Sequence, residues 1–125
     1  MDVGAAATVR LVVSSADTAV ALGSGDVEVL ATPRLLALAE EATVRAVAPQ
    51  LAADLTTVGT RVELVHLAGT PIGRTVEAEA RLVEVDGRRL VFDVEAREGG
   101  TVLAHGRVER AVVDRQRFLD RANGV

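Results

Sequence analysis

The sequence contains neither cysteine nor lysine, and these two absences exclude several kinds of chemistry. Without cysteine the chain forms no disulfides and offers no thiolate to a metal ion. Without lysine it cannot form a Schiff base, and all 14 basic residues are arginines. Aromatic residues are also scarce, since Phe92 and Phe118 are the only two. The core must therefore consist of Val, Leu and Ala, which suits a sheet packed against a helix.

Charge and hydropathy also narrow the choice of partners and location. A net charge of −4 with so few aromatic rings makes nucleic acid a poor candidate partner. No apolar run approaches the roughly 20 residues needed to span a bilayer, so no membrane partner is expected. The first ten residues, MDVGAAATVR, lack the basic start and apolar run of a signal peptide. We expect a single cytoplasmic domain over residues 1–125.

The segment from Thr32 to Pro49 is predicted to form one long helix around which the rest of the chain is arranged. Thr32 is a residue type that caps helix starts, and Pro33 suits the first helical position. Pro49 ends the segment, because a proline moves the preceding residue out of the helical region. Glu40 falls between the apolar and the polar faces of this predicted helix. The apolar face is predicted to comprise Leu35, Leu38, Ala39, Ala42, Thr43 and Ala46.

The other segments mostly alternate between apolar and polar residues, as strands do. The segment from Ser14 to Val29 is too long for a simple turn and could wall a site. The last four strands are predicted to form an antiparallel meander that wraps around the helix, a hot-dog fold of the α+β class. Turns are expected at Gly69–Gly73, Asp86-Gly87 and Glu98–Gly100. The expected strands are Ala7–Val13, Thr56–Leu67, Arg74–Val85, Arg88–Arg97 and Thr101–Val113, followed by a tail helix over Asp114–Ala122.

Three polar residues lie on faces that are otherwise apolar: Glu40, His66 and Arg110. A polar residue at a buried position needs an explanation, whereas His105 and Arg107 alternate with the apolar face and should be solvated. Each of the three also has a purely structural interpretation. The histidine could be satisfied at a strand end, the glutamate could lie at a solvated helix edge, and the arginine could cap a sheet edge or a dimer contact. Taken together, the acid, the imidazole and the start of the helix indicate a site in which Glu40 and His66 are expected to meet across a cleft beside Thr32.

Other chemistries find little support in the sequence. Gly23-Ser24-Gly25 is not a nucleophile elbow, because the G-x-S-x-G pattern and its strand–helix context are missing. The stretch from Gly69 to Gly73 lacks the lysine of a phosphate-binding loop. The two histidines lie on separate strands with no carboxylate at ligand spacing, so we expect no metal site.

At the residues singled out above, the sequence resembles the fluoroacetyl-CoA thioesterase family, a branch of the hot-dog thioesterases. The resemblance covers about two-thirds of the chain, roughly from Ala31 to Phe118. It is carried by Ala31-Thr32, Glu40 eight positions on, Val44-Arg45-Ala46, Ala48-Pro49, Gly59-Thr60, His66, Glu84-Val85, Gly87-Arg88-Arg89-Leu90 and Glu109-Arg110-Ala111-Val112.

The resemblance implies an acyl-CoA thioesterase in which Thr32, Glu40 and His66 are catalytic, while Gly59 and Arg110 contact the acyl-CoA substrate. It implies no cofactor, and it implies a homodimer paired through the sheets. The fluoroacetyl-specific member carries phenylalanines in the segment before the helix. Residues 23–30, GSGDVEVL, contain none, so the resemblance does not extend to fluoroacetyl specificity.

Several alternatives remain open at this point. His66 is suited to take a proton from water near neutral pH, and backbone amides could hold the developing oxyanion. Glu40 could orient His66, act as the base itself, or attack the carbonyl carbon to give an anhydride. A non-catalytic acyl-CoA or small-ligand binding protein of the same fold is the alternative to an enzyme. Hydratase or dehydratase chemistry is disfavoured, because the acid–histidine pair expected on the helix of that branch is absent.

Overall fold

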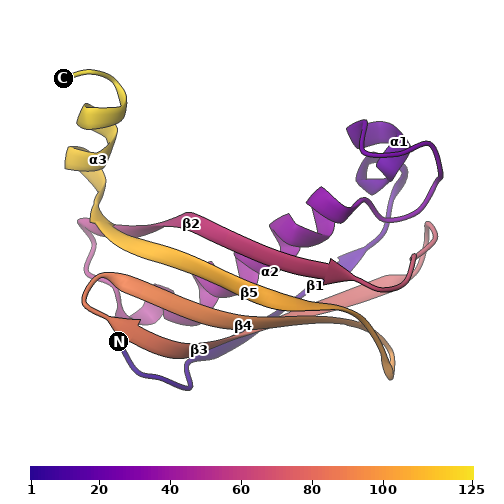
Figure 1. The fold of residues 1–125 in the computed structure, drawn as a ribbon, viewed down its shortest axis with the longest axis horizontal. Coiled ribbons are helices and arrows are strands. Elements are labelled where there is room, and N and C mark those ends of the chain that lie inside the picture. Colours follow the sequence, from indigo (N-terminus) through magenta and orange to yellow (C-terminus); the bar gives the residue numbers. More distant parts are fainter.

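The computed structural model describes all 125 residues, and its architecture is the predicted hot-dog fold. Figure 1 shows a five-stranded antiparallel sheet with the long helix α2 lying across one face. None of the helices combines the length and hydropathy needed to cross a bilayer. The elements are β1 (Ala6–Val12), η1 (Ser15–Asp17), α1 (Ala19–Leu22), α2 (Thr32–Val47), η2 (Ala48–Gln50), β2 (Leu55–His66), β3 (Thr75–Asp86), β4 (Arg89–Glu98), β5 (Thr101–Asp114) and α3 (Arg115–Ala122).

The order of the strands differs from the predicted four-strand meander. The sheet runs β1-β3-β4-β5-β2, so β2 pairs with β5 at one edge instead of with β3. The segment 67–74, which contains the turn predicted at Gly69–Gly73, is a crossover that leads from the β2 edge to the β1 side. It is held by bonds from Leu30 N–H to the Thr70 carbonyl and from Gly73 N–H to the Val13 carbonyl. Tight hairpins join β3 to β4 and β4 to β5, as predicted.

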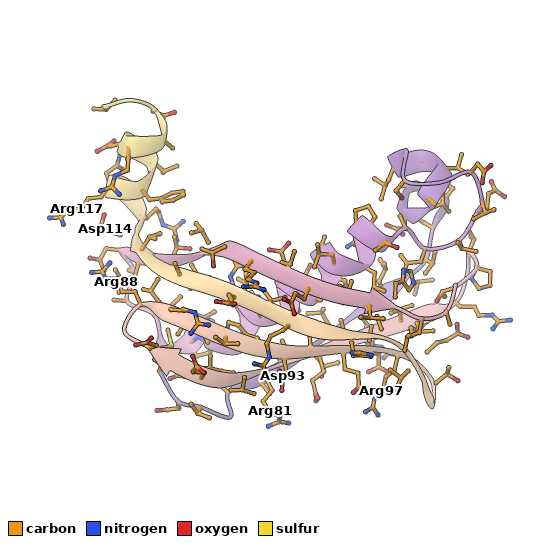
Figure 2. All side chains as sticks on the ribbon, in the orientation of Figure 1. Arg81, Arg88, Asp93, Arg97, Asp114 and Arg117 are labelled. Atoms are coloured by element: carbon orange, nitrogen blue, oxygen red, sulfur yellow. The ribbon has the colours of Figure 1, made fainter.

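The core lies between α2 and the sheet, and its residues are those that the two periodicities predict. Every residue of the predicted apolar helix face is at least nine-tenths buried. The alternating residues of β3 and β4 are buried as well, with Phe92 fully enclosed. The opposite face of the sheet is charged, and Arg81, Asp93 and Arg97 are among its exposed side chains (Figure 2). The buried residues of the two strands are Val76, Ala78, Ala80, Leu82, Leu90, Phe92, Val94 and Ala96.

The connection before α2 contains structure that the sequence analysis did not predict. The single turn α1 is capped by Thr18, whose hydroxyl oxygen accepts from the Ala21 N–H, and it ends at Gly23 with a φ of 69°. Val20 and Leu22 remain about half exposed, so the helix forms from its caps and not from an apolar face. Figure 1 shows α1 and α3 projecting past the β2 edge at opposite ends of that strand.

Gly106 on β5 allows a close approach between β5 and β2. A Cβ atom built on Gly106 would lie 2.0 Å from the backbone oxygen of Glu63. The obstructing atom belongs to the backbone of a paired strand, so it cannot move away without breaking the β2–β5 ladder. The pairing that places β2 at the sheet edge therefore depends on this glycine.

We predict that Gly106→Ala lowers the melting temperature by about 10 °C or more. The overlap should cost about 3 kcal/mol, and each kcal/mol shifts the melting temperature by about 4 °C in a domain of this size. Gly100→Ala is the matched control, because a Cβ there meets nothing within 4 Å. Thermal unfolding followed by circular dichroism measures both, and equal melting temperatures for the two variants would contradict the prediction.

Candidate functional site

The predicted site residues form two separate groups along α2. Thr32 contacts His66 at the start of the helix, and Glu40 contacts Arg110 two turns further on. Eight residues of helix separate the two groups by about 12 Å along the axis. No hydrogen bond joins Glu40 to His66 within the chain. The structure thus brings the acid and the imidazole to the same helix but not into contact.

Thr32 does not cap the helix, contrary to the prediction from sequence. Ala31 occupies the N-cap position, with φ −69° and ψ 140°, and Thr32 is the first helical residue. Its hydroxyl oxygen lies 2.8 Å from Nδ1 of His66 at the end of β2. The N–H groups of Thr32 and Arg34 have no acceptor within the chain, whereas the Leu35 N–H donates to the Ala31 carbonyl. The first turn therefore presents unpaired amides beside the Thr32–His66 pair.

His66 keeps one ring nitrogen free. Nδ1 is paired with Thr32, while Nε2 is buried and has no hydrogen-bond partner. Buried polar atoms in native proteins are rarely left unpaired, and those that are often serve a function or await a ligand. The tautomer of the ring decides whether Nε2 offers a lone pair or a proton. Either form could act on a molecule bound at this position.

A pocket of about 350 Å³ opens in front of this pair. One wall is the segment before α2, including Val27, Val29 and Leu30, and the other is the start of the 67–74 crossover. The backbones of these walls are joined, since the Leu30 N–H donates to the Thr70 carbonyl over 2.8 Å. The expectation that residues 14–29 could wall a site agrees with this arrangement. No aromatic residue lines the pocket.

The second group is built around the buried side chain of Arg110. Its guanidinium donates to the Thr57 hydroxyl at 2.9 Å, to the Thr57 carbonyl at 3.1 Å and to Oε2 of Glu40 at 3.2 Å. Burial lowers the pKa of Arg110, while the charge and hydrogen bond of Glu40 oppose that shift. The Glu40 side chain is 35% exposed, so its carboxylate is held on one side and open on the other.

Gly59 makes room for the Glu40 carboxylate. A Cβ on Gly59 would lie 2.7 Å from Oε2 of Glu40, and the β2–β5 register shifts directly after this residue. Sequence reasoning found Gly59 only through the family resemblance and missed Thr57 altogether. The available signal was that Thr57 is a polar residue on the inner face of its strand. His105 and Arg107 are solvent exposed, as predicted.

Asp17 fixes the wall of the pocket to the start of α2. Its carboxylate accepts from the Ser14 N–H at 2.8 Å, the Ser14 hydroxyl at 2.9 Å and Nε of Arg34 at 3.0 Å. Its backbone carbonyl accepts from the Ala31 N–H. Burial alone would raise the pKa of Asp17, but the hydrogen bonds from Ser14 and the Arg34 charge outweigh it and hold the pKa below its ordinary value. Sequence analysis missed Asp17, because the contacts with Arg34 and Ala31 that tie it to the start of α2 are distant in the chain.

Comparisons with known proteins agree on one family. The FlK family model, described as fluoroacetyl-CoA-specific thioesterase, matches residues 13–116. A fluoroacetyl-CoA thioesterase from Streptantibioticus cattleyicolor is 42% identical over 91 residues, which are 73% of this chain and 66% of that protein, just under two thirds of its length.

Solved structures give the same result. The fluoroacetyl-CoA thioesterase FlK superposes with a TM-score of 0.93 at 35% identity, covering 99% of this chain and 96% of FlK. A FlK variant in complex with acetyl-CoA also matches with a TM-score of 0.93. A hot-dog-like protein from Thermanaerovibrio acidaminovorans is 26% identical with a TM-score of 0.87, over 96% of this chain and 89% of that protein.

We predict that Asp17→Asn destabilises the protein at pH 7 by about 2 kcal/mol, the usual worth of hydrogen bonds to a charged group. Because the folded pKa of Asp17 is lowered, this stabilisation is complete above the unfolded value of about 3.9. It is lost as the pH falls through the folded pKa. Urea unfolding from pH 7 down to about pH 3 should show the difference between the two proteins shrink. Asp26→Asn, an exposed acid of the same segment, is the control, and a difference independent of pH would contradict the assignment.

Proposed function

Because the chain belongs to the family of fluoroacetyl-CoA-specific thioesterases, we propose that it is an acyl-CoA thioesterase, which hydrolyses a small acyl-CoA to the free acid and CoA. The observation that carries the proposal is the half-buried His66, which lines the pocket, pairs with Thr32 through Nδ1 and leaves Nε2 without a partner. An acyl-CoA substrate also agrees with the cytoplasmic location expected above.

In the proposed reaction water attacks the thioester carbonyl carbon. The carbonyl oxygen becomes an oxyanion in the tetrahedral intermediate, and the unpaired amides of the first turn of α2 are suited to hold it. The C–S bond then breaks, the CoA thiolate leaves and takes up a proton, and the acyl group departs as the carboxylic acid. Water supplies both the hydroxyl group of the acid and the proton of the thiol.

His66 is the proposed proton carrier. If Nδ1–H donates to the Thr32 hydroxyl oxygen, the lone pair of Nε2 has no partner in the protein and is available to accept a proton from the attacking water. The resulting imidazolium then gives this proton to the leaving thiolate. Thr32 supports the reaction by fixing the ring and its tautomer, in the way that a carboxylate or carbonyl does in other enzymes.

Glu40 is the proposed second catalytic group. Within one chain it does not contact His66, which argues against the role of orienting the imidazole of its own chain. Arg110 holds the carboxylate through a hydrogen bond of 3.2 Å. A carboxylate that is held on one side and open on the other suits two roles. It can activate the attacking water, or it can itself attack the carbonyl carbon, which expels the CoA thiolate and leaves an anhydride that water then hydrolyses. Arg110 and Gly59 position it.

A homodimer paired along β2 would bring the two groups together. β2 is an edge strand, and Val62 and Val65 on it are 41% and 50% exposed. Two identical strands related by a twofold axis pair antiparallel, each residue finding its counterpart on the partner. Such pairing directs the partner's Gly59, in the first half of β2, toward His66 at the end of the strand. The partner's Glu40 would then approach His66, and each dimer would contain two composite sites.

The acyl group is proposed to be short and not selected for fluorine. The curated relative and the FlK structures are named for fluoroacetyl-CoA. In this chain the pocket wall before α2 combines the aliphatic Val27 and Val29 with the polar Ser24 and Asp26 and contains no phenylalanine. Such a wall offers no aromatic ring edge to a C–F bond. Discrimination between fluoroacetyl- and acetyl-CoA should therefore not exceed the ratio of their hydrolysis rates in buffer.

We predict that the protein hydrolyses short acyl-CoA thioesters, and that His66→Ala and Glu40→Gln each lower kcat/KM by about 100-fold or more, the usual worth of general acid–base catalysis. Release of free thiol from acetyl-, propionyl- and fluoroacetyl-CoA measures the rates. His105→Ala and Glu41→Gln are matched controls, because both residues are exposed and lie outside the proposed site.

If the wild-type protein hydrolysed the thioesters no faster than buffer alone, the proposal that it is an enzyme would be wrong. If acyl-CoA then bound without turnover, the chain would be a binding protein. If His66→Ala and Glu40→Gln both hydrolysed the thioesters at the wild-type rate, the proposed catalytic roles of these residues would be wrong.

Gly59→Ala gives a separate prediction for the position of the carboxylate. The new methyl group would displace the Glu40 carboxylate, the flexible end of a side chain, so the fold should tolerate it. We expect kcat to fall about tenfold or more, because misplacement by about 1 Å can cost 100-fold. The melting temperature should change by only a few degrees. Wild-type kcat with a normal melting temperature would show that the carboxylate need not occupy this position.

A further inference from the structure

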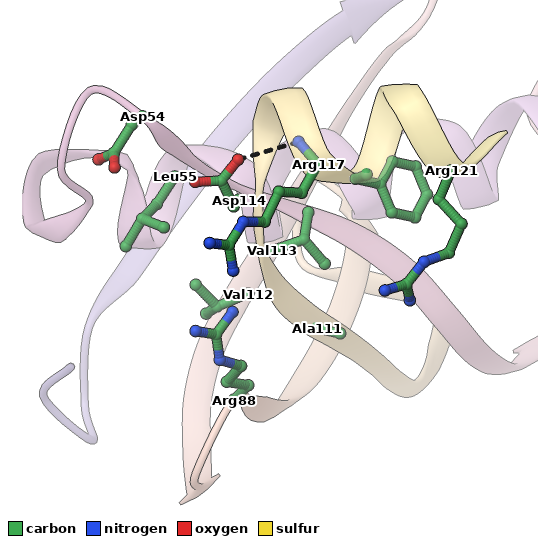
Figure 3. Close-up of a pocket in the computed structure, with 10 residues that line it drawn as sticks. Asp54, Leu55, Arg88, Ala111, Val112, Val113, Asp114, Arg117 and Arg121 are labelled. Atoms are coloured by element: carbon green, nitrogen blue, oxygen red, sulfur yellow. Dashed lines mark hydrogen bonds between the residues drawn. The ribbon is translucent and has the colours of Figure 1, made fainter. Parts of the chain in front are cut away.

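A second concave site lies at the other end of β2, beneath α3. It is a hollow of about 670 Å³, which we call the arginine hollow. Arg88 enters from the β3–β4 turn, and Arg117 and Arg121 enter from α3. Figure 3 shows the guanidinium groups of Arg88 and Arg117 on the same side of the hollow, with Arg121 on the other. The end of β5, including Val112, and the ring of Phe118 supply apolar lining.

The arginine hollow concentrates unpaired positive charge in a protein of net charge −4. Eight of the 14 arginines form ion pairs, but none of the three in the hollow does. Asp54 and Asp114 are the acids of its lining, and Asp114 is engaged in capping α3 by accepting from the Arg117 N–H at 3.0 Å. Three exposed, unpaired guanidinium groups beside an apolar surface suit a ligand with several phosphates and a flat ring.

We propose that the arginine hollow binds the nucleotide end of the CoA substrate, with the arginines on the 3′-phosphate and diphosphate and the adenine near Phe118. The inference rests on the proposed thioesterase function. Phosphate contacts of this kind hold the substrate without taking part in the reaction, so they act on KM and leave kcat unchanged.

The geometry assigns the nucleotide to the active site of the partner chain. Leu55 at the arginine hollow and His66 at the pocket are the first and last residues of β2, about 36 Å apart along an extended strand. A CoA molecule does not reach over this distance. In a dimer whose β2 strands pair antiparallel, the start of β2 in one chain, where Leu55 lines the hollow, lies toward the end of β2 in the other, where His66 lines the pocket. The hollow of one chain then adjoins the site of the other.

The test compares two thioesters and two double variants. Arg117→Gln/Arg121→Gln should raise KM for acetyl-CoA about 100-fold, about tenfold for each charged contact, at unchanged kcat. Hydrolysis of the N-acetylcysteamine thioester, which lacks the nucleotide, should be unaffected. Arg10→Gln/Arg81→Gln is the control, because it removes the same charge from two arginines that form no ion pair and lie outside the hollow. An unchanged KM for acetyl-CoA, or an equal loss with both thioesters, would overturn the proposal.

Two further measurements separate this proposal from its premises. Calorimetric titration with adenosine 3′-phosphate 5′-diphosphate needs no turnover, and it should show binding to wild type and about 100-fold weaker binding to the Arg117/Arg121 variant. No binding to wild type would overturn the proposal even if hydrolysis were observed. Sedimentation velocity should give a dimer for all variants. Dissociation of the Arg117/Arg121 variant alone would mean that the arginines serve the interface and not the nucleotide.

A mixed dimer tests whether the arginine hollow of one chain serves the active site of its partner. One chain carries Arg117→Gln/Arg121→Gln and the other carries His66→Ala. If the hollow serves the partner's site, the intact hollow and the intact His66 belong to the same composite site, and half of the wild-type activity returns at the wild-type KM. If the mixed dimer shows only the raised KM, the hollow serves its own chain and the assignment is wrong.

Discussion

One buried cation joins the three elements on which the site depends. Arg110 comes from β5, donates twice to Thr57 on β2, and reaches Glu40 on α2. A buried guanidinium without partners would cost several kcal/mol, so the three elements are constrained to positions that satisfy it. This constraint fixes the position of β2 against β5 and the orientation of the Glu40 carboxylate. Gly59 completes the arrangement by leaving the space that the carboxylate occupies.

The same helix carries residues of both polar groups because alanines make up half of its apolar face. Short side chains let α2 lie close to the sheet, with Ala39 and Ala42 buried against it. Residues at the flank of that face, such as Glu40, are thereby brought within reach of strand side chains. The start of the helix meets the end of β2, where Thr32 pairs with His66. The packing of α2 against the sheet therefore also determines where the polar groups lie.

The sequence predicts the elements well and their connections less well, and the reason is the range of the interactions involved. Burial repeats with the period of a helix or a strand, so the apolar faces and the three inward polar residues Glu40, His66 and Arg110 could be identified locally. Strand order depends on a crossover whose glycines and proline resemble a hairpin turn. The pairing of Thr32 with His66 spans 34 residues, and tertiary contact overrides the capping preference. The Thr32–His66 pair and the Glu40–Arg110 pair are separate because the rise of the helix sets Thr32 and Glu40 apart. No single sequence motif shows this separation.

The place of β2 at the sheet edge also determines the order in which the molecule can be assembled. β3, β4 and β5 join through tight hairpins, and such local pairings form early because little chain entropy is lost. β2 precedes them in the chain but can pair only with β5, the last strand to emerge during synthesis. A nascent chain therefore holds β2 unpaired until β5 has left the ribosome. His66 lies at the end of β2, so its position beside Thr32 depends on the pairing of β2 with β5.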